Sequence, residues 1–314
     1  MRKVPLRFLK QFSSVRVLVV GDLIADHYVF GQTERISREA PVLVVRHERD
    51  EIALGGAANA AANVRSLGGN VHVVGVLGRD EMGRRMKRLF HEVGIHVDSA
   101  AGARVQTETK TRVLAGGMST TRQQMLRIDR GSSGDLPSIV RRRLARMVDE
   151  GARNADVVIV SDYGAGVLCS EVRKILLEHA RSGLSVCVDS RFELHQYEGF
   201  SVCKPNEPEL ATLTGMPISS DAQVREAAEK AHAMLNCETL LVTRGRRGML
   251  VVEKSGRTTA IGVHGHADAV DVTGAGDTVH ATMALAIGAH ASPIDAAALA
   301  NVAGSIVVQK QGTG

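Results

Sequence analysis

The feature that most limits how this chain can fold is the alternation of short β-branched runs with amphipathic stretches. Nearly continuous apolar runs are typical of strands buried on both faces, whereas apolar residues spaced by three and four indicate helices. The strand-like runs lie at 15–22, 71–76, 157–160, 185–188 and 239–243, and the helix-like stretches at 57–67, 81–93, 139–151 and 222–235. Strand alternating with helix predicts an α/β fold, a doubly wound, mainly parallel sheet with helices on both faces.

Two segments, at about 24–50 and 103–130, break this alternation. They lack long helical periodicity and are rich in β-forming residues, for example at 42–45 and 109–114. We interpret them as insertions that form a small antiparallel sheet and project from the core as a lid. The length of the chain suits a single domain, 1–314, with this excursion. An apolar face on the lid would need burial against substrate or a second subunit.

The composition argues against nucleic-acid and membrane partners. The net charge of +5 admits an anionic partner, but no Trp, three Tyr and six Phe leave little to stack on bases. A small phosphorylated substrate explains the charge equally well. No apolar run approaches the roughly 18 residues of a membrane span, and the start has no signal-peptide pattern. The four cysteines contain no Cys-x-x-Cys pair, so we expect reduced thiols in a cytoplasmic protein.

The segment 271–280, which reads DVTGAGDTVH, joins a small-residue turn to an acid and then to a helical pattern. Gly274, Ala275 and Gly276 carry no bulky side chain, so their backbone N–H groups can form an anion cradle. Asp277 follows, in the first turn of a helix whose positive end faces the same guest. A carboxylate beside an anion hole suits phosphoryl transfer to a hydroxyl, because it can accept the proton. The alternative is a glycine-rich loop that caps an ordinary helix.

A second glycine-rich element, LGGAAN, opens the first long helix. Gly55 and Gly56 would let backbone amides approach a substrate oxygen, and the Asn59 side chain can both donate and accept hydrogen bonds. Asp22 follows the first strand, where a carboxylate can hold two vicinal hydroxyls. These residues predict a sugar site. The alternatives are a tight strand-to-helix turn for the glycines and a turn cap for Asp22.

Two cations of the lid favour a phosphate on the substrate. Lys110 and Arg112 occupy alternate positions of one expected strand and therefore share a face. Arg35 and Arg38 lie in the other insertion, and cations from both segments suit a phosphate clamp, for which arginine has a two-pronged geometry. Exposed charges on an edge strand are the alternative.

Polar residues that follow later strands suit a nucleotide and its metal. Asn206 and Glu209, in KPNEPE, lie one helical turn apart and could hold hydrated Mg²⁺ beside phosphates, with Glu209 acting through water. Thr243 and Gly245, in TRGRRG, can approach nucleotide phosphates. Asp162, in SDYGAG, places a polar group at the rim where α/β sheets bind ligands. No P-loop motif is present, which excludes that class of nucleotide-binding protein.

Taken together, five motifs appear in the order and approximate spacing of the ribokinase superfamily: VVGD, LGGAAN, KPNEPE, TRGRRG and DVTGAGDTV. Further segments resemble the kinase module of D-glycero-D-manno-heptose 7-phosphate kinases: ERISREAPV, TKTRVL, MLRIDR, SDYGAG and ANVAGSIVVQKQGT. The resemblance covers nearly the whole chain, and five ordered motifs are far more specific than any one of them.

The resemblance implies transfer of phosphate from ATP, with Mg²⁺, to the anomeric hydroxyl of the heptose 7-phosphate. The product would be the 1,7-bisphosphate, used in ADP-heptose synthesis for lipopolysaccharide. It also implies a homodimer formed through the lid and a monovalent cation near the anion-hole loop. Asp277 matches the family's base, and the anion hole is matched by Gly274, Ala275 and Gly276. The sugar site is matched by Asp22, Gly55, Gly56 and Asn59, and the substrate phosphate by Lys110 and Arg112. The nucleotide and magnesium side is matched by Asn206, Glu209, Thr243 and Gly245.

The chain departs from the family pattern in several places. His27 stands where an arginine is usual, and VDSR replaces Asp-Pro-Lys. The sequence stops at Gly314, where relatives continue into a final helix, and we expect no nucleotidyltransferase module of the kind that many relatives carry. Two other functions therefore stay open. One is a ribokinase-like kinase of another sugar phosphate or of a nucleoside, and the other is a nonenzymatic sugar-phosphate sensor.

Overall fold

A nine-stranded sheet forms the centre of the computed structural model, which describes residues 4–102, 105–117, 122–132, 135–265 and 272–309. Its strand order is β13-β12-β11-β10-β9-β8-β1-β4-β5. The strands are β1 (Arg16–Gly21), β4 (Asn70–Val76), β5 (His96–Ala100), β8 (Val157–Asp162), β9 (Ser185–Ser190), β10 (Val202–Cys203), β11 (Thr239–Thr243), β12 (Met249–Glu253) and β13 (Thr258–Ile261). All neighbours pair in parallel except β11 with β12 and β12 with β13. The predicted mainly parallel sheet is confirmed.

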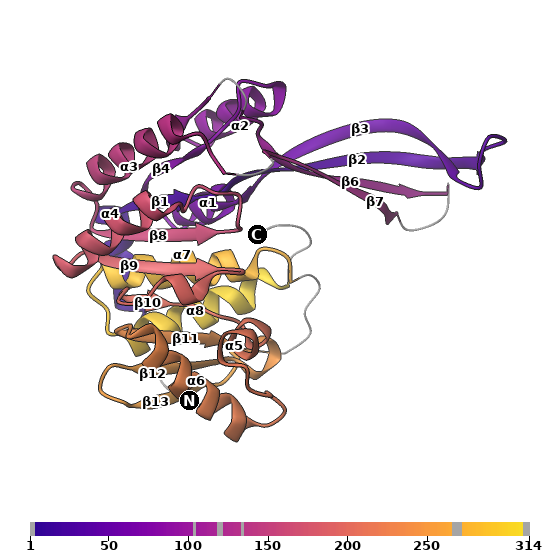
Figure 1. Cartoon of the computed structure of the whole chain (residues 1–314). Coiled ribbons are helices and arrows are strands. Elements are labelled where there is room, and N and C mark those ends of the chain that lie inside the picture. Colours follow the sequence, from indigo (N-terminus) through magenta and orange to yellow (C-terminus); the bar gives the residue numbers. More distant parts are fainter. Residues whose placement is uncertain (1–3, 103–104, 118–121, 133–134, 266–271, 310–314) are drawn as a thin grey trace.

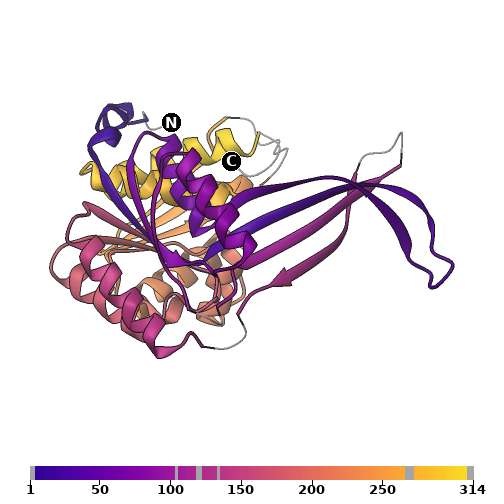
Figure 2. The same cartoon turned by 90° about the horizontal axis from the view of Figure 1, so that it is seen from above.

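Helices cover both faces of this sheet (Figures 1 and 2). One apolar core packs η1 (Leu6–Ser14), α1 (Ala57–Ser66), α2 (Glu81–Glu92), α7 (Ala275–Gly288) and α8 (Pro293–Val307) against the strands. The core on the other face includes α3 (Ser138–Ala152), α4 (Ser170–Arg181), α5 (Glu207–Thr214) and α6 (Asp221–Leu235). Short 3-10 turns, η2 (Leu194–Gln196) and η3 (Gly245–Arg247), follow β9 and β11. No helix in the described ranges combines the length and apolarity needed to cross a bilayer.

The order of the strands determines where a ligand can bind. From β1 the chain builds β4 and β5 on one side, and it later builds β8 to β11 on the other side. The direction of winding therefore reverses between β1 and β8. Ligands of such sheets bind in the crevice at the carboxyl ends of the strands near this reversal. Asp22 directly follows β1 and Asp162 ends β8, so both lie at this crevice.

The two insertions form a separate four-stranded sheet that extends as an arm from the core (Figures 1 and 2). Its order is β3-β2-β6-β7, with β2 (Leu23–Ile36), β3 (Leu43–Gly56), β6 (Glu108–Gly116) and β7 (Gln123–Arg130). The expectation of an antiparallel lid is wrong for its central pair, because β2 and β6 run parallel. They follow β1 and β5, which end at the same edge of the core sheet, so the chain enters the lid twice in the same direction.

The lid has two chemically different faces. Alternating positions place Lys110 and Arg112 on one face, together with their neighbour Asp26 on β2. On the opposite face of β6 and β7, Val113 pairs with Leu126, whose side chain is largely exposed. One face therefore suits an anionic ligand, and the other offers apolar surface.

Candidate active site

Asp277 lies buried in the first turn of α7. Asn59 Nδ2 donates a hydrogen bond to its Oδ2 atom at 2.7 Å, and the Tyr163 hydroxyl donates to Oδ1 at 3.2 Å. Gly274, at the N-cap, has a φ of 79°, which glycine adopts without strain. The helix can therefore start here, with the amides of its first turn close to the Asp277 carboxylate. Burial raises the pKa of Asp277 to about 6, and the Asn59 hydrogen bond opposes this shift. Asp277 is therefore poised to accept a proton near neutral pH.

A buried cation lies next to this helix terminus. Lys204, which follows β10, is only 5% exposed, and its Nζ atom lies 2.7 Å from Oδ2 of Asp189. A Cβ atom placed on Gly276 would lie 3.8 Å from the same Nζ atom. Burial lowers the pKa of Lys204, but Asp189, Glu209 and Asp277 outweigh that effect and raise it above its ordinary value. A fixed positive charge therefore reinforces the N-terminus of α7.

Two cavities meet at the start of α7. The polar cavity has a volume of about 470 Å³ and contains Asp277, Lys204 and Asp189 in its lining. The apolar cavity, of about 360 Å³, lies between η3 and α8. Val272 and Gly276 line both, so the two cavities adjoin. The arrangement offers space for an elongated ligand with one apolar and one charged end.

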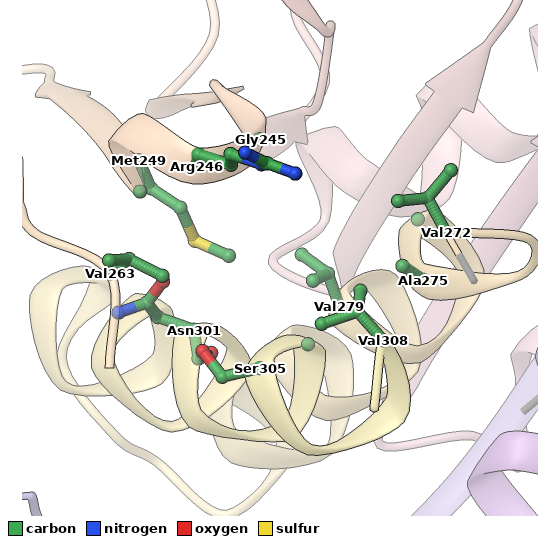
Figure 3. A pocket seen from close by; sticks show the side chains of 13 residues that line it. Gly245, Arg246, Met249, Val263, Val272, Ala275, Val279, Asn301, Ser305 and Val308 are labelled. Carbon is green, nitrogen blue, oxygen red and sulfur yellow. The ribbon is translucent and has the colours of Figure 1, made fainter. Parts of the chain in front are cut away.

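Figure 3 shows the apolar cavity from close by. The side chains of Met249, Val279 and Val308 approach it from three elements. Asn301 and Ser305 of α8 supply polar atoms along one side. A mainly apolar cavity with a few polar groups at its edge is the usual lining of a small-molecule site.

The nucleotide-side residues predicted from the sequence lie along these cavities. Asn206 and Glu209 form a capping box at the start of α5, in which Asn206 Oδ1 accepts the Glu209 amide at 2.8 Å. In return, Glu209 Oε2 accepts the Asn206 amide at 2.9 Å. Both residues line the polar cavity, as Thr243 does, whereas Gly245 lines the apolar one. Burial raises the pKa of Glu209.

The two glycines predicted for the sugar site form the junction between the lid and α1. Gly56 is the N-cap of α1, the helix that positions Asn59 beside Asp277. A Cβ atom on Gly55 would lie 2.3 Å from Oδ2 of Asp26, so only glycine lets this lid carboxylate lie so close to the backbone. The structure thus brings the LGGAAN motif and the catalytic candidate together.

Asp22 holds the loop that follows β8. Its carboxylate accepts the backbone amides of Tyr163, Ala165 and Val167 at 2.7, 3.1 and 3.2 Å, and it is 1% exposed. These bonds match the turn cap that was considered as an alternative, and direct contact with a sugar hydroxyl stays a prediction. Burial raises the pKa of Asp22 to about 6, although the three amides oppose the shift.

Asp162 lines the polar cavity, but its carboxylate is also committed to protein partners. Gly164 N donates to it at 3.0 Å, Ser190 Oγ at 2.9 Å and the Tyr197 hydroxyl at 2.6 Å. Asp162 therefore holds the loop after β8 against β9.

The lid brings Lys110 to the same region, whereas Arg35 pairs with Val44 near the far end of β2. Lys110 Nζ lies 5.2 Å from the centre of the Tyr163 ring, whose hydroxyl binds Asp277. Burial lowers the pKa of Lys110, while the charge of Asp26 opposes the shift. Arg112 donates to Asp26 Oδ1 at 2.5 Å, so one of its donors is already used.

Three residues of this region were not assigned a role from the sequence. Lys204 and Tyr163 lie inside the motifs KPNEPE and SDYGAG, and Asp26 lies in the strand after VVGD. The motifs and the neighbouring strand indicated that these residues lie near the site, but the residues that they contact come from distant segments of the sequence. Asp271, the first residue of the DVTGAGDTVH segment, lies outside the described residues.

The chain is similar to known carbohydrate kinases along most of its length. The sequence profile of the pfkB family of carbohydrate kinases matches residues 15–314. The D-beta-D-heptose 7-phosphate kinase of Bordetella bronchiseptica is 39% identical over 316 residues, which cover 97% of this chain and 94% of that protein.

Other relatives are longer than this chain. The "Bifunctional protein HldE" of a Caulobacter strain is 39% identical over 311 residues, covering 97% of this chain and 61% of that protein. The chain thus spans about three-fifths of the length of such bifunctional relatives. Arabidopsis thaliana ribokinase, solved with ribose and ATP, has a TM-score of 0.73 at 24% identity, covering 95% of this chain and 94% of that one, which shows a shared fold.

Proposed function

The chain belongs to the pfkB family of carbohydrate kinases, and we propose that it phosphorylates the anomeric hydroxyl of D-glycero-D-manno-heptose 7-phosphate with ATP. The product is the 1,7-bisphosphate, an intermediate of ADP-heptose synthesis for lipopolysaccharide. The observation that carries this proposal is the buried Asp277, held by two side-chain donors at the junction of an apolar and a polar cavity. The similarity to the Bordetella kinase supports the choice of sugar.

In the proposed reaction, Asp277 accepts the proton of the anomeric hydroxyl while that oxygen forms a bond to the γ-phosphorus of ATP. The bond from this phosphorus to the bridging oxygen breaks, and ADP leaves with the bonding electrons. Asn59 and Tyr163 hold the carboxylate in one orientation, so the base is in place before the substrate arrives.

Charge on the moving phosphoryl group is neutralised by groups that are fixed before binding. α7 begins at Ala275, after its N-cap Gly274, and the N-terminus of the helix carries partial positive charge. The Ala275 amide donates to Val272 O at 3.3 Å, so the amides of Gly274 and Gly276 are the proposed donors to the phosphoryl group. Lys204 adds a full charge at the same place, and its pairing with Asp189 keeps the ammonium from turning away. We therefore add Lys204 to the catalytic residues.

The nucleotide fits the pair of cavities end to end. The base would occupy the apolar cavity beside Gly245, and the phosphates would extend past Gly276 into the polar one. Thr243 lines the polar cavity and can donate its hydroxyl to a phosphate oxygen.

The carboxylate oxygens at and near Glu209 are suitable ligands for a hydrated magnesium ion. Mg²⁺ prefers oxygen ligands and keeps several waters, and the Glu209 carboxylate lines the polar cavity together with Asp189. When bound, Mg²⁺ would neutralise charge on the nucleotide phosphates. A monovalent cation near the anion-hole loop is expected from the family resemblance alone and stays a prediction, because residues 266–271 lie outside the described ranges.

The lid would supply selectivity for a sugar that already carries a phosphate. Lys110 and Arg112 share one face of β6 and can bind that phosphate at the far end of the heptose. We further propose that the opposite, apolar face of the lid pairs two chains into a homodimer that works in the cytoplasm. The exposed Leu126 and Ile128 on that face support the dimer.

The test is an ATP-consumption assay with purified protein and a panel of acceptors. We expect turnover of heptose 7-phosphate, with a new anomeric phosphate signal in ³¹P NMR and no reaction of the unphosphorylated heptose at the same concentration. Brisk turnover of fructose 6-phosphate or adenosine without turnover of heptose 7-phosphate would replace the substrate. Sugar-phosphate binding without turnover of any acceptor would favour the nonenzymatic sensor.

A further inference from the structure

A second cluster of ligand-type side chains lies at the β4–β5 edge of the large sheet. His72 of β4 and His96 and Asp98 of β5 each offer one ligand atom, and these atoms all lie within 4.8 Å of one another. His72 Nε2 is 2.9 Å from Asp98 Oδ2, and His96 Nε2 is 3.7 Å from the same oxygen. Two imidazoles therefore converge on one carboxylate oxygen.

The backbone imposes this convergence. In the parallel register, His72 lies opposite His96, so their side chains leave the sheet on the same face. Asp98 is two residues after His96 and shares that face. The two imidazole rings have centres 5.0 Å apart and planes tilted by 37°. The register of the two paired strands therefore brings the three side chains to one place on the sheet.

The surroundings suit a cation that also binds a water molecule. The side chains of His96 and Asp98 are 72% and 46% exposed, so an ion is accessible from water. A Cβ atom on Gly151 would lie 3.5 Å from His72 Nδ1, which places the ring beside the last turn of α3. The C-terminal turn of a helix carries partial negative charge and favours a cation.

We propose that His72, His96 and Asp98 bind one divalent transition-metal ion, with zinc as the best match, which links the edge strand β5 to β4. Zinc accepts imidazole nitrogen and carboxylate oxygen in a tetrahedral arrangement with water as the fourth ligand. Bonds of about 2.0–2.1 Å separate neighbouring ligand atoms by about 3.3 Å in that geometry. The distances of 2.9 and 3.7 Å lie on either side of this value. Mg²⁺ prefers oxygen ligands alone, so it does not fit.

This site is separate from the proposed active site. His72 lies near the amino end of β4, roughly 13 Å along the strand from Val76 at its carboxyl end. Among the residues that the structure describes, β5 pairs with β4 alone, so the proposed ion would add a second link between these two strands. The proposal does not depend on the kinase activity.

The test titrates metal-free, full-length protein with Co²⁺, whose visible absorption reports tetrahedral binding, and then displaces it with Zn²⁺. We expect one cobalt ion per chain at this site and at least about tenfold weaker binding in His96→Ala and Asp98→Asn, since even losing an outer partner of a ligand costs that much. His91→Ala, which removes an exposed imidazole from the last turn of α2, serves as the control and keeps the site. Zn²⁺ should raise the unfolding temperature of the wild type and the control but not of the two variants.

Equal cobalt spectra and equal zinc stabilisation in all four proteins would overturn the proposal, because binding would then occur elsewhere, for example at cysteines. His96 is exposed, so His96→Ala is expected to fold. If Asp98→Asn does not fold, His96→Ala decides the outcome by itself.

Discussion

The core and the lid each place a lysine at the proposed active site, but they hold the two lysines in different ways. Lys204 of the core is buried, paired with Asp189 and fixed beside α7. Lys110 of the lid is partly buried and lies over the ring of Tyr163, and the charge of Asp26 acts on it, but no ion pair within the described residues fixes its ammonium group. In the proposed reaction, the core would therefore supply a preorganised charge for the phosphoryl group, and the lid would supply a charge for the phosphate of the sugar. Catalysis should depend on the core and substrate choice on the lid.

The sharpest test of the core is Asp277→Asn. We expect kcat to fall by about 10²–10⁴-fold, because the general base is removed, while sugar and nucleotide binding are largely kept. The unfolding temperature should not drop, since a neutral amide avoids the cost of burying a charge. Steady-state kinetics, calorimetric binding and thermal unfolding check the three parts. Unchanged turnover would refute the role of Asp277.

Lys204→Met should lower both turnover and stability. Loss of one charge-stabilising donor typically costs about 10²–10³-fold in kcat. Asp189 would also lose its partner, and breaking a buried pair costs about 3–5 kcal/mol, at the lower end here because Asp189 is partly exposed. The double variant Lys204→Met with Asp189→Asn should recover stability, measured by denaturant unfolding, without recovering turnover. Recovery of both would make Lys204 a purely structural residue.

The same substitution in the lid should have the opposite effect on stability. We expect Lys110→Met to raise KM for the sugar phosphate by about tenfold to a hundredfold, the value of one hydrogen bond to a charged group. Its pKa is lowered by burial, which means that the folded protein disfavours the charge, so Met should leave stability equal or higher. KM for ATP is the internal control. A parallel rise in both KM values would contradict the assignment of Lys110 to the sugar phosphate.

The pH profile examines the core site without a mutation. Because burial raises the pKa of Asp277 to about 6, the base is ionised above that pH and protonated below it. The ratio kcat/KM should therefore be level at pH values well above 6, fall to half of its maximum near pH 6, and drop about tenfold per unit at lower pH. The substrate phosphate titrates in the same range, so its own titration is measured and divided out. A profile that stays level down to pH 5 would mean that burial does not raise the pKa of Asp277.

The difference between core and lid also explains what could be predicted from the sequence. The buried parallel strands have continuous apolar runs, so 157–160 and 239–243 were located to within two residues of β8 and β11. In contrast, α8 is apolar around its whole circumference and shows no amphipathic stripe, so periodicity did not single it out. The parallel pairing of β2 with β6 depends on where both strands leave the core, which no local pattern records.

For the site, too, the sequence predicted local structure but not contacts between distant segments. The position of Asp277 at a helix N-terminus followed from local small residues and helical spacing. Its partner Asn59 is 218 residues away, and Asp22 binds the amide of Tyr163 from 141 residues away. Such contacts depend on strand order, so the sequence indicated which residues are polar and near a strand end, but not which would pair.

The smallest expected effect comes from the apolar face of the lid. Replacing Leu126, which is 54% exposed on the edge strand β7, by Asp should weaken the proposed dimer, because a buried interface excludes an unpaired carboxylate. Arg127→Gln changes the opposite face of the same strand and serves as the matched control. Sedimentation at micromolar concentration should show more monomer for Leu126→Asp alone. Turnover of Leu126→Asp at saturating substrate should change little, because Asp277 and Lys204 belong to the core. A loss of kcat comparable to that of Lys204→Met would mean that the lid contributes to the chemistry itself.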